Sequence, residues 1–139
     1  MTNPCFATSF AAESAFYAAF EAADVDAMML VWENSELITC IHPLGAPLQG
    51  MIQLRASWQQ IFATGTRLRF RIININTVTQ NDLAIHVVYE TITVVNAAEQ
   101  PRQPIIATNI YSRKPEGWHM VSHHASPAPP IEDHSHRLH

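Results

Sequence analysis

The sequence predicts an α+β fold in which three N-terminal helices pack on one face of a strongly curved antiparallel sheet. Two observations lead to this prediction. In the first half of the chain, large apolar residues recur at the spacing of helical turns, whereas from Arg67 onward they alternate every second residue. Helices followed by a run of strands, rather than strands alternating with helices, are typical of α+β domains.

The three helices are expected at residues 8–23, 24–32 and 51–63. The first segment is alanine-rich, and its large side chains share a helical spacing: Phe10, Phe16, Tyr17 and Phe20. In the third segment four large side chains are expected to face the core: Ile52, Leu54, Trp58 and Phe62. Gly65 is expected to end this third helix.

The strands are separated by turn-forming residues. They are expected at residues 36–42, 66–79, 83–95, 104–114 and 118–126. Pro43 favours extended backbone at His42, because the residue before a proline is disfavoured in the helical region. Three arginines, Arg67, Arg69 and Arg71, share the face of their strand opposite to its apolar residues.

Length and composition limit the function classes. The 139 residues are expected to form one domain over residues 1–127, followed by a flexible Pro- and His-rich tail at 128–139. A net charge of −4 argues against nucleic acid as a partner, and no apolar run is long enough to cross a membrane. Two cysteines make no disulfide framework, so a reducing cytoplasm is expected. Only 14% of residues are charged, which favours a homodimer that covers apolar surface.

Several motifs, taken in order, resemble a known family. They are "DVDAMMLVW", "CIHPLGAPLQG", "SWQQIF" and "TNIYSRKPEGWHMVSHHASP". Over about residues 8–127 the chain resembles the SnoaL-like branch of the nuclear transport factor 2-like superfamily, which includes ketosteroid isomerase. The resemblance implies a cystatin-like cone, with helices packed into a curved sheet around a pocket, and usually a homodimer formed through the sheet. It does not imply one function, because this fold supports many.

The resemblance identifies His42 and Asn109 as a candidate catalytic pair. Aligned with ketosteroid isomerase, His42 lies where that enzyme has its general-base aspartate, and Asn109 where it has a protonated aspartate that hydrogen-bonds the oxyanion. A neutral imidazole can take a proton near neutral pH, and an asparagine amide can donate to an enolate or carbonyl oxygen. The tyrosine of that site corresponds here to Phe16, so steroid isomerisation is not expected to carry over.

Glu90 is the third candidate catalytic residue. Two-residue alternation places it on the same strand face as Val88 and Ile92. If that face is concave, the carboxylate points into an apolar pocket and needs a partner. If it is convex, Glu90 is solvated or lies at the dimer contact. The sequence leaves both readings open.

Six further residues are expected to line the pocket: Phe16, Trp32, Trp58, Val88, His123 and His124. One of the two adjacent histidines must face inward on a regular strand, and the sequence does not decide which. Eight histidines raise the question of a metal, but the predicted helices and strands contain no HxH or ExxH spacing, so neither a metal nor another cofactor is expected. Cys40 and His42 lie two residues apart on a strand, a separation that does not normally bring side chains into contact.

The sequence therefore predicts a protein that binds a small hydrophobic molecule in the cone, with isomerase- or lyase-type proton transfer by His42 as base and Asn109 as polarising donor. The alternative is a non-catalytic ligand-binding or dimeric assembly module. Convergence of His42, Asn109 and an acid on one cavity would favour the first reading. A cone filled by the aromatic side chains of the first helix would favour the second.

Overall fold

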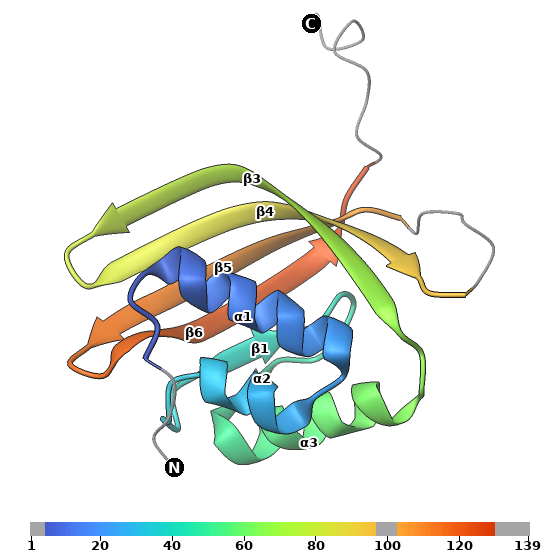
Figure 1. The fold of residues 1–139 in the computed structure, drawn as a ribbon, viewed down its shortest axis with the longest axis horizontal. Coiled ribbons are helices and arrows are strands. Elements are labelled where there is room, and N and C mark those ends of the chain that lie inside the picture. Colours follow the sequence, from blue (N-terminus) through green and yellow to red (C-terminus); the bar gives the residue numbers. More distant parts are fainter. Residues whose placement is uncertain (1–4, 97–102, 130–139) are drawn as a thin grey trace, which may run out of the picture.

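The computed structural model describes residues 5–96 and 103–129. Helices α1 (Ser9–Ala22), α2 (Val25–Val31) and α3 (Gly50–Ala63) pack against the concave face of a curved, six-stranded sheet (Figure 1). The strands are β1 (Thr39–Ile41), β2 (Leu48–Gln49), β3 (Leu68–Gln80), β4 (Leu83–Val94), β5 (Ile105–Lys114) and β6 (Gly117–Pro127). This arrangement confirms the predicted α+β cone. Residues 130–139 of the expected tail lie outside the described residues, and the packed chain continues to Ala128, whose N–H donates to the carbonyl of Pro104.

Side-chain caps start the first two helices. The Thr8 hydroxyl accepts the N–H of Ala11 at 3.0 Å, and the Asp24 carboxylate accepts the N–H of Ala27 at 3.0 Å. Between the two helices, Ala23 has a φ of 53° and donates its N–H to the last carbonyls of α1. This left-handed residue turns the chain sharply, so that α2 folds back against α1.

The sheet has the strand order β2-β1-β6-β5-β4-β3, and its pairs are antiparallel except one. Strand β1 runs parallel to β6, which sets Cys40 beside His123 and Ile41 beside His124. A fully antiparallel sheet was expected. Turn residues in the sequence indicate only pairings between neighbouring strands, and β1 and β6 are far apart in the chain. The parallel pair brings the His-Pro step next to the C-terminal histidines.

The long strands are interrupted by two irregularities in register. The extra residue is Ile75 on β3, between Asn74 and Asn76, and Val121 on β6, where the partners of Ile110 and Tyr111 are Ser122 and Met120. Such bulges increase the local twist and bend the strand. They accompany the curvature with which β3 to β6 wrap around α1 (Figure 1).

Aromatic side chains fill the space between the helices and the sheet. Phe16 is fully buried, and its ring lies edge-on to those of Tyr17, Trp32 and Trp58, at centroid distances of 4.8, 6.4 and 5.7 Å. On α3, Leu54 and Trp58 face inward as expected, but Ile52 is 81% exposed. The expectation for Ile52 was wrong because residues two apart on a helix point to nearly opposite sides.

Candidate functional site

A chain of buried polar side chains crosses the concave face of the sheet. The Tyr17 hydroxyl donates to Oε2 of Glu90 at 2.6 Å, and Nδ2 of Asn109 donates to the Tyr17 oxygen at 3.0 Å. Oδ1 of Asn109 lies 2.5 Å from Nδ1 of His123. We call these four residues the interior network. Glu90 therefore faces the concave side, which resolves the alternative that the sequence left open.

The elements that carry the interior network fix its geometry. Glu90 and Asn109 lie on the inward faces of β4 and β5, and His123 is the register partner of Asn109 on β6. Tyr17 reaches them from α1. The sequence prediction assigned no phenol to this site, because Phe16 occupies the corresponding position; the next residue on the helix supplies it instead.

Burial sets the protonation states of the interior network. Desolvation raises the pKa of Glu90 from 4.5 to about 7, while the hydrogen bond from Tyr17 partly counteracts this rise. Desolvation, together with the nearby imidazoles of His42 and His124, lowers the pKa of His123 from 6.5 to about 3. His123 is therefore neutral at pH 7. It carries its proton on Nδ1, because the Asn109 oxygen facing that atom can only accept.

His42 lies apart from the interior network, at the end of β1. Its Nε2 is 2.9 Å from the Ser57 hydroxyl on α3, and its ring lies edge-on to Trp58 at 4.9 Å. Burial lowers the pKa of this half-buried imidazole, so it is a neutral base at pH 7. Among the described residues, no hydrogen bond joins His42 to Asn109 or Glu90. Of the three expected catalytic residues, Glu90 and Asn109 thus belong to the interior network, whereas His42 lies outside it.

Cys40 contacts His42, contrary to expectation. Its sulfur lies 3.7 Å from Nε2 of His42, at the point where β1 ends at Ile41 and regular strand alternation stops. Desolvation and the carboxylate of Glu90 raise the pKa of Cys40 to about 12. The side chain is therefore a thiol at neutral pH and not an activated nucleophile.

Most of the residues expected to line a pocket instead form the core. Phe16, Trp32, Trp58 and Val88 are all at most 2% exposed. His123 points inward, whereas His124 is exposed on the other face of β6. Rings of α1 and α3 occupy the middle of the cone, where Phe20 packs on Trp58 at 4.9 Å and on Phe62 at 6.0 Å.

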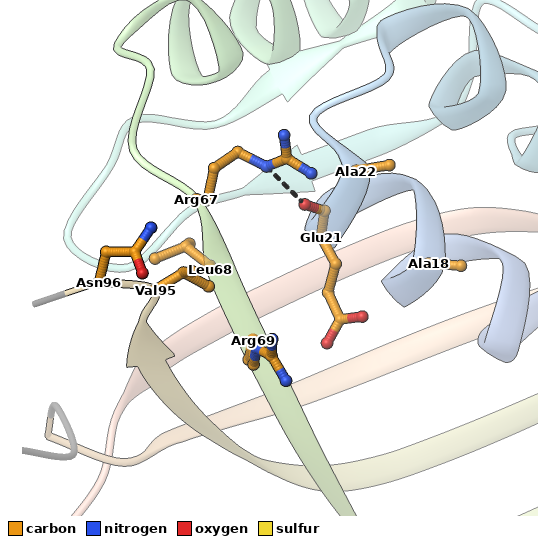
Figure 2. A pocket seen from close by; sticks show the side chains of 8 residues that line it. All are labelled: Ala18, Glu21, Ala22, Arg67, Leu68, Arg69, Val95 and Asn96. Atoms are coloured by element: carbon orange, nitrogen blue, oxygen red, sulfur yellow. Dashed lines mark hydrogen bonds between the residues drawn. The ribbon is translucent and has the colours of Figure 1, made fainter. Parts of the chain in front are cut away.

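Three hollows near the surface of the described residues are lined by side chains other than His42, Asn109 and Glu90. One of them, of about 600 Å³, lies between the last turn of α1 and the start of β3 (Figure 2). Its Arg67 guanidinium donates to the Glu21 carbonyl at 3.2 Å, and Arg69 lies further along the same strand. Two of the three arginines predicted to share one face of this strand, Arg67 and Arg69, therefore border this hollow.

A second group of buried polar residues was missed by the sequence analysis. His86 on β4 is flanked by Ser9 and Glu13, which both come from the first turns of α1. Two signals pointed to this group. His86 lies four residues before Glu90 and so shares its strand face, and Ser9 and Glu13 are one helical turn apart.

The described residues hold no cluster of three or more His, Cys, Asp or Glu side chains that could bind a metal ion. In the same part of the chain, no helix has the length and apolarity needed to cross a membrane.

Comparisons with known proteins agree with the fold. Among solved structures, a candidate calcium/calmodulin-dependent protein kinase type II association domain from Thiobacillus denitrificans is 45% identical, with a TM-score of 0.85, over 90% of this chain and 98% of that chain. A candidate dehydratase from the NTF2-like family of Streptomyces avermitilis is 28% identical, with a TM-score of 0.76, over 86% of this chain and 93% of that chain. An NTF2-like protein from Pseudomonas putida, 15% identical with a TM-score of 0.75 over 88% of this chain and 92% of that chain, shows the fold alone.

Among curated proteins, the F-box protein SKIP8 of Arabidopsis thaliana is 28% identical over 102 residues, which are 73% of this chain and 42% of that protein. This chain thus spans less than half the length of that relative. The SnoaL-like domain family matches residues 11–132, which include the whole sheet and all of the three helices except the first two residues of α1. The chain therefore belongs to the SnoaL-like family within the nuclear transport factor 2-like superfamily.

Proposed function

We propose that this domain is a self-association module in which two copies pair through the convex face of the sheet. The composition of that face carries the proposal. From Ile85 to Thr93 on β4 and from Ile106 to Ser112 on β5, the residues that alternate with the buried ones include no Asp, Glu, Lys or Arg: Ile85, Val87, Tyr89, Thr91, Thr93, Ile106, Thr108, Ile110 and Ser112. Lys114, at the end of β5, is the first charged residue beyond them. Depletion of charge at the centre and enrichment in tyrosine and aliphatic side chains are typical of the core of a protein interface.

Apolar side chains run across the strands of this face in two rows, Ile73–Tyr89–Ile106 and Val78–Ile85–Ile110. At the outer ends of these rows, Ile73 is 39% and Val78 is 46% exposed. Arg69 and Arg71 continue the same face of β3 beyond the apolar rows, and both are exposed. An apolar centre with a charged rim fits a second copy better than it fits solvent.

The interior of the cone also favours this proposal over catalysis. The rings of Phe16, Phe20, Trp58 and Phe62 occupy the space in which a substrate would have to meet both His42 and Asn109. The structure that is 45% identical is a candidate association domain, in keeping with the same role here. A filled core suits a module whose outer surface carries its function.

Replacing Val87 with glutamate at the middle of the convex face should separate the copies. The carboxylate would be buried without a partner on association, at a cost of about 2 kcal/mol or more, so the dissociation constant should rise about 30-fold or more. Size-exclusion chromatography with light scattering, over a dilution series, measures this change. The folded state of the monomer is checked by circular dichroism.

The matched control is Ile52→Glu. Ile52 is another large aliphatic residue, 81% exposed, on α3 and away from the convex face. This variant should associate like the wild type. Equal association of V87E and wild type would refute the convex face as the contact.

A second candidate function is binding of a small hydrophobic molecule at His42, with proton transfer. It is supported by the neutral, half-buried imidazole beside Ser57 and by the 28% identical candidate dehydratase. Here Asn109 would act as the polarising donor only after Phe16 and Trp58 move aside.

If this second function holds, a hydrophobic ketone or lactone should raise the melting temperature of the wild type, and His42→Ala should abolish that rise. His119→Ala, at the other end of β6, is the control and should retain it. A thermal-shift screen makes the measurement. Absence of any stabilising compound would remove this candidate and leave the association module.

A further inference from the structure

The buried polar group of Ser9, His86 and Glu13 has its side chains in the same sequence of contacts as a catalytic triad with a serine nucleophile. The Ser9 hydroxyl oxygen lies 2.9 Å from Nε2 of His86, and Nδ1 of the same ring lies 3.0 Å from Oε1 of Glu13. Serine on one ring nitrogen and a carboxylate on the other is the arrangement by which serine hydrolases of unrelated folds are recognised. None of these residues belongs to the interior network or to the convex face.

Each contact has a chemical consequence. A Glu13 carboxylate that accepts the Nδ1 proton fixes the tautomer of His86, so that the lone pair of Nε2 faces Ser9. That lone pair can take the hydroxyl proton as the serine oxygen attacks. The same carboxylate then stabilises the imidazolium that forms. A serine that merely anchored the helix would need no carboxylate behind its histidine.

The position of Ser9 adds groups that could hold an oxyanion. Ser9 is the first residue of α1, a helix of 14 residues, and the first four N–H groups of a helix have no intrahelical acceptor. Thr8 takes the N–H groups of Ala11 and Ala12, which leaves those of Ser9 and Phe10. Beside the site, the fully buried Tyr111 hydroxyl has no hydrogen-bond partner within the described residues, and its ring lies 4.8 Å from that of His86.

The group is buried beneath the first turns of α1, but the residues around it are exposed. The neighbours of Ser9 in sequence, Thr8 and Phe10, are both exposed. Thr77, the register partner of His86 on the edge strand β3, is half-buried, and the next concave-face residue, Thr79, is exposed. Ser9 itself is only 6% exposed and His86 is fully buried, with the Phe10 ring at 4.6 Å, so a reagent reaches the serine when the exposed Phe10 side chain moves aside.

We propose that Ser9, His86 and Glu13 form an acyl-accepting site for small activated esters with an apolar group that packs on Phe10. In the first step, the Ser9 oxygen forms a bond to the ester carbonyl carbon while its proton passes to Nε2 of His86. The carbon–oxygen bond to the leaving alkoxide or phenoxide then breaks, and His86 returns the proton to that leaving group. Attack by water on the acyl-serine, with His86 again carrying the proton, releases the acid and restores the serine.

The test uses the whole chain and two probes, p-nitrophenyl acetate and diisopropyl fluorophosphate. With the first, p-nitrophenol should be released in a burst of one equivalent per chain, and intact mass should show one acetyl group. With the second, peptide mapping should place one diisopropylphosphoryl group on Ser9, the fluoride leaving as its counterpart. The peptide containing Ser57, whose hydroxyl also meets an imidazole but without a carboxylate behind it among the described residues, should remain unmodified.

Variants separate the triad from chance reactivity. Ser9→Ala should lose both adducts, and Ser14→Ala, an exposed serine on the same helix, should keep them. His86→Gln should slow acylation by about 100-fold or more. If that variant does not fold, Glu13→Gln should slow acylation at least tenfold with Ser9 still present. A folded wild type that gains no adduct, or an adduct that persists in S9A, would overturn the proposal.

Discussion

Replacing Phe16 with alanine should lower the free energy of unfolding by about 3–5 kcal/mol and the melting temperature by on the order of 10 °C. Phe16 is fully buried, and its ring packs near Trp32 directly after α2, Trp58 on α3 and His123 on β6. Alanine would remove the ring from the centre of the cone and leave a cavity that three surrounding elements cannot close together. Urea unfolding followed by tryptophan fluorescence measures the change.

Phe10→Ala is the matched control, since it removes the same side chain from the same helix at a position that is 47% exposed. It should cost only about 1 kcal/mol. If both variants lost equal stability, or if F16A lost less than about 1 kcal/mol, the filled cone described here would be wrong. An open pocket in solution would then be the better description.

Replacing Glu90 with glutamine should make the protein more stable at pH 8 by on the order of 3 kcal/mol, and should change little at pH 4.5. Burial raises the pKa of Glu90 from 4.5 to about 7, so the folded state holds a proton that the unfolded chain has already released. The stability linked to this proton is complete below pH 4.5 and is lost as pH rises to about 7. Glutamine stays neutral and can still accept the Tyr17 hydroxyl.

His123 contributes the opposite trend, because its pKa is lowered from 6.5 to about 3. The unfolded chain takes up this proton first, so stability falls as pH drops below 6.5. Between about pH 4.5 and 6.5 the two slopes, each about 1.4 kcal/mol per pH unit, oppose each other in the wild type. E90Q should therefore reveal a rise in stability with pH across that window.

Urea unfolding at half-unit steps from pH 4.5 to 8 measures this difference. Glu116→Gln, an exposed carboxylate in the turn before β6, is the control and should follow the wild type at every pH. A constant difference between E90Q and wild type across the range would show that folding does not raise the pKa of Glu90.

The sequence was sufficient to predict the fold because its patterns are local. The change from helical to two-residue spacing, the turn residues and the His-Pro step all act within a few residues of the chain. The same alternation placed Glu90 and Val88 on one face. Only the sheet partners on β5 and β6 decide that this face is concave, and those contacts are distant in sequence.

The arrangement of the candidate site depended on such distant contacts. Whether His42 meets Asn109 is decided by how far Phe16 and Trp58 reach into the cone, which is a matter of packing rather than of pattern. The Tyr17 phenol joins Asn109 although the resemblance aligned its neighbour there. Ser9 and Glu13 come from α1 and His86 from β4, so the sequence showed which face each residue shares but not that the two faces meet.

Sedimentation of the wild-type protein over a broad dilution series is the most direct test of the association module. One chain has a mass of 15.6 kDa, so the predicted dimer has twice that, about 31 kDa. Pairing through the uncharged convex face predicts that this species dominates at micromolar concentration and persists in high salt, because its core holds no ion pairs to screen. A particle of 15.6 kDa at every concentration would contradict the proposed function.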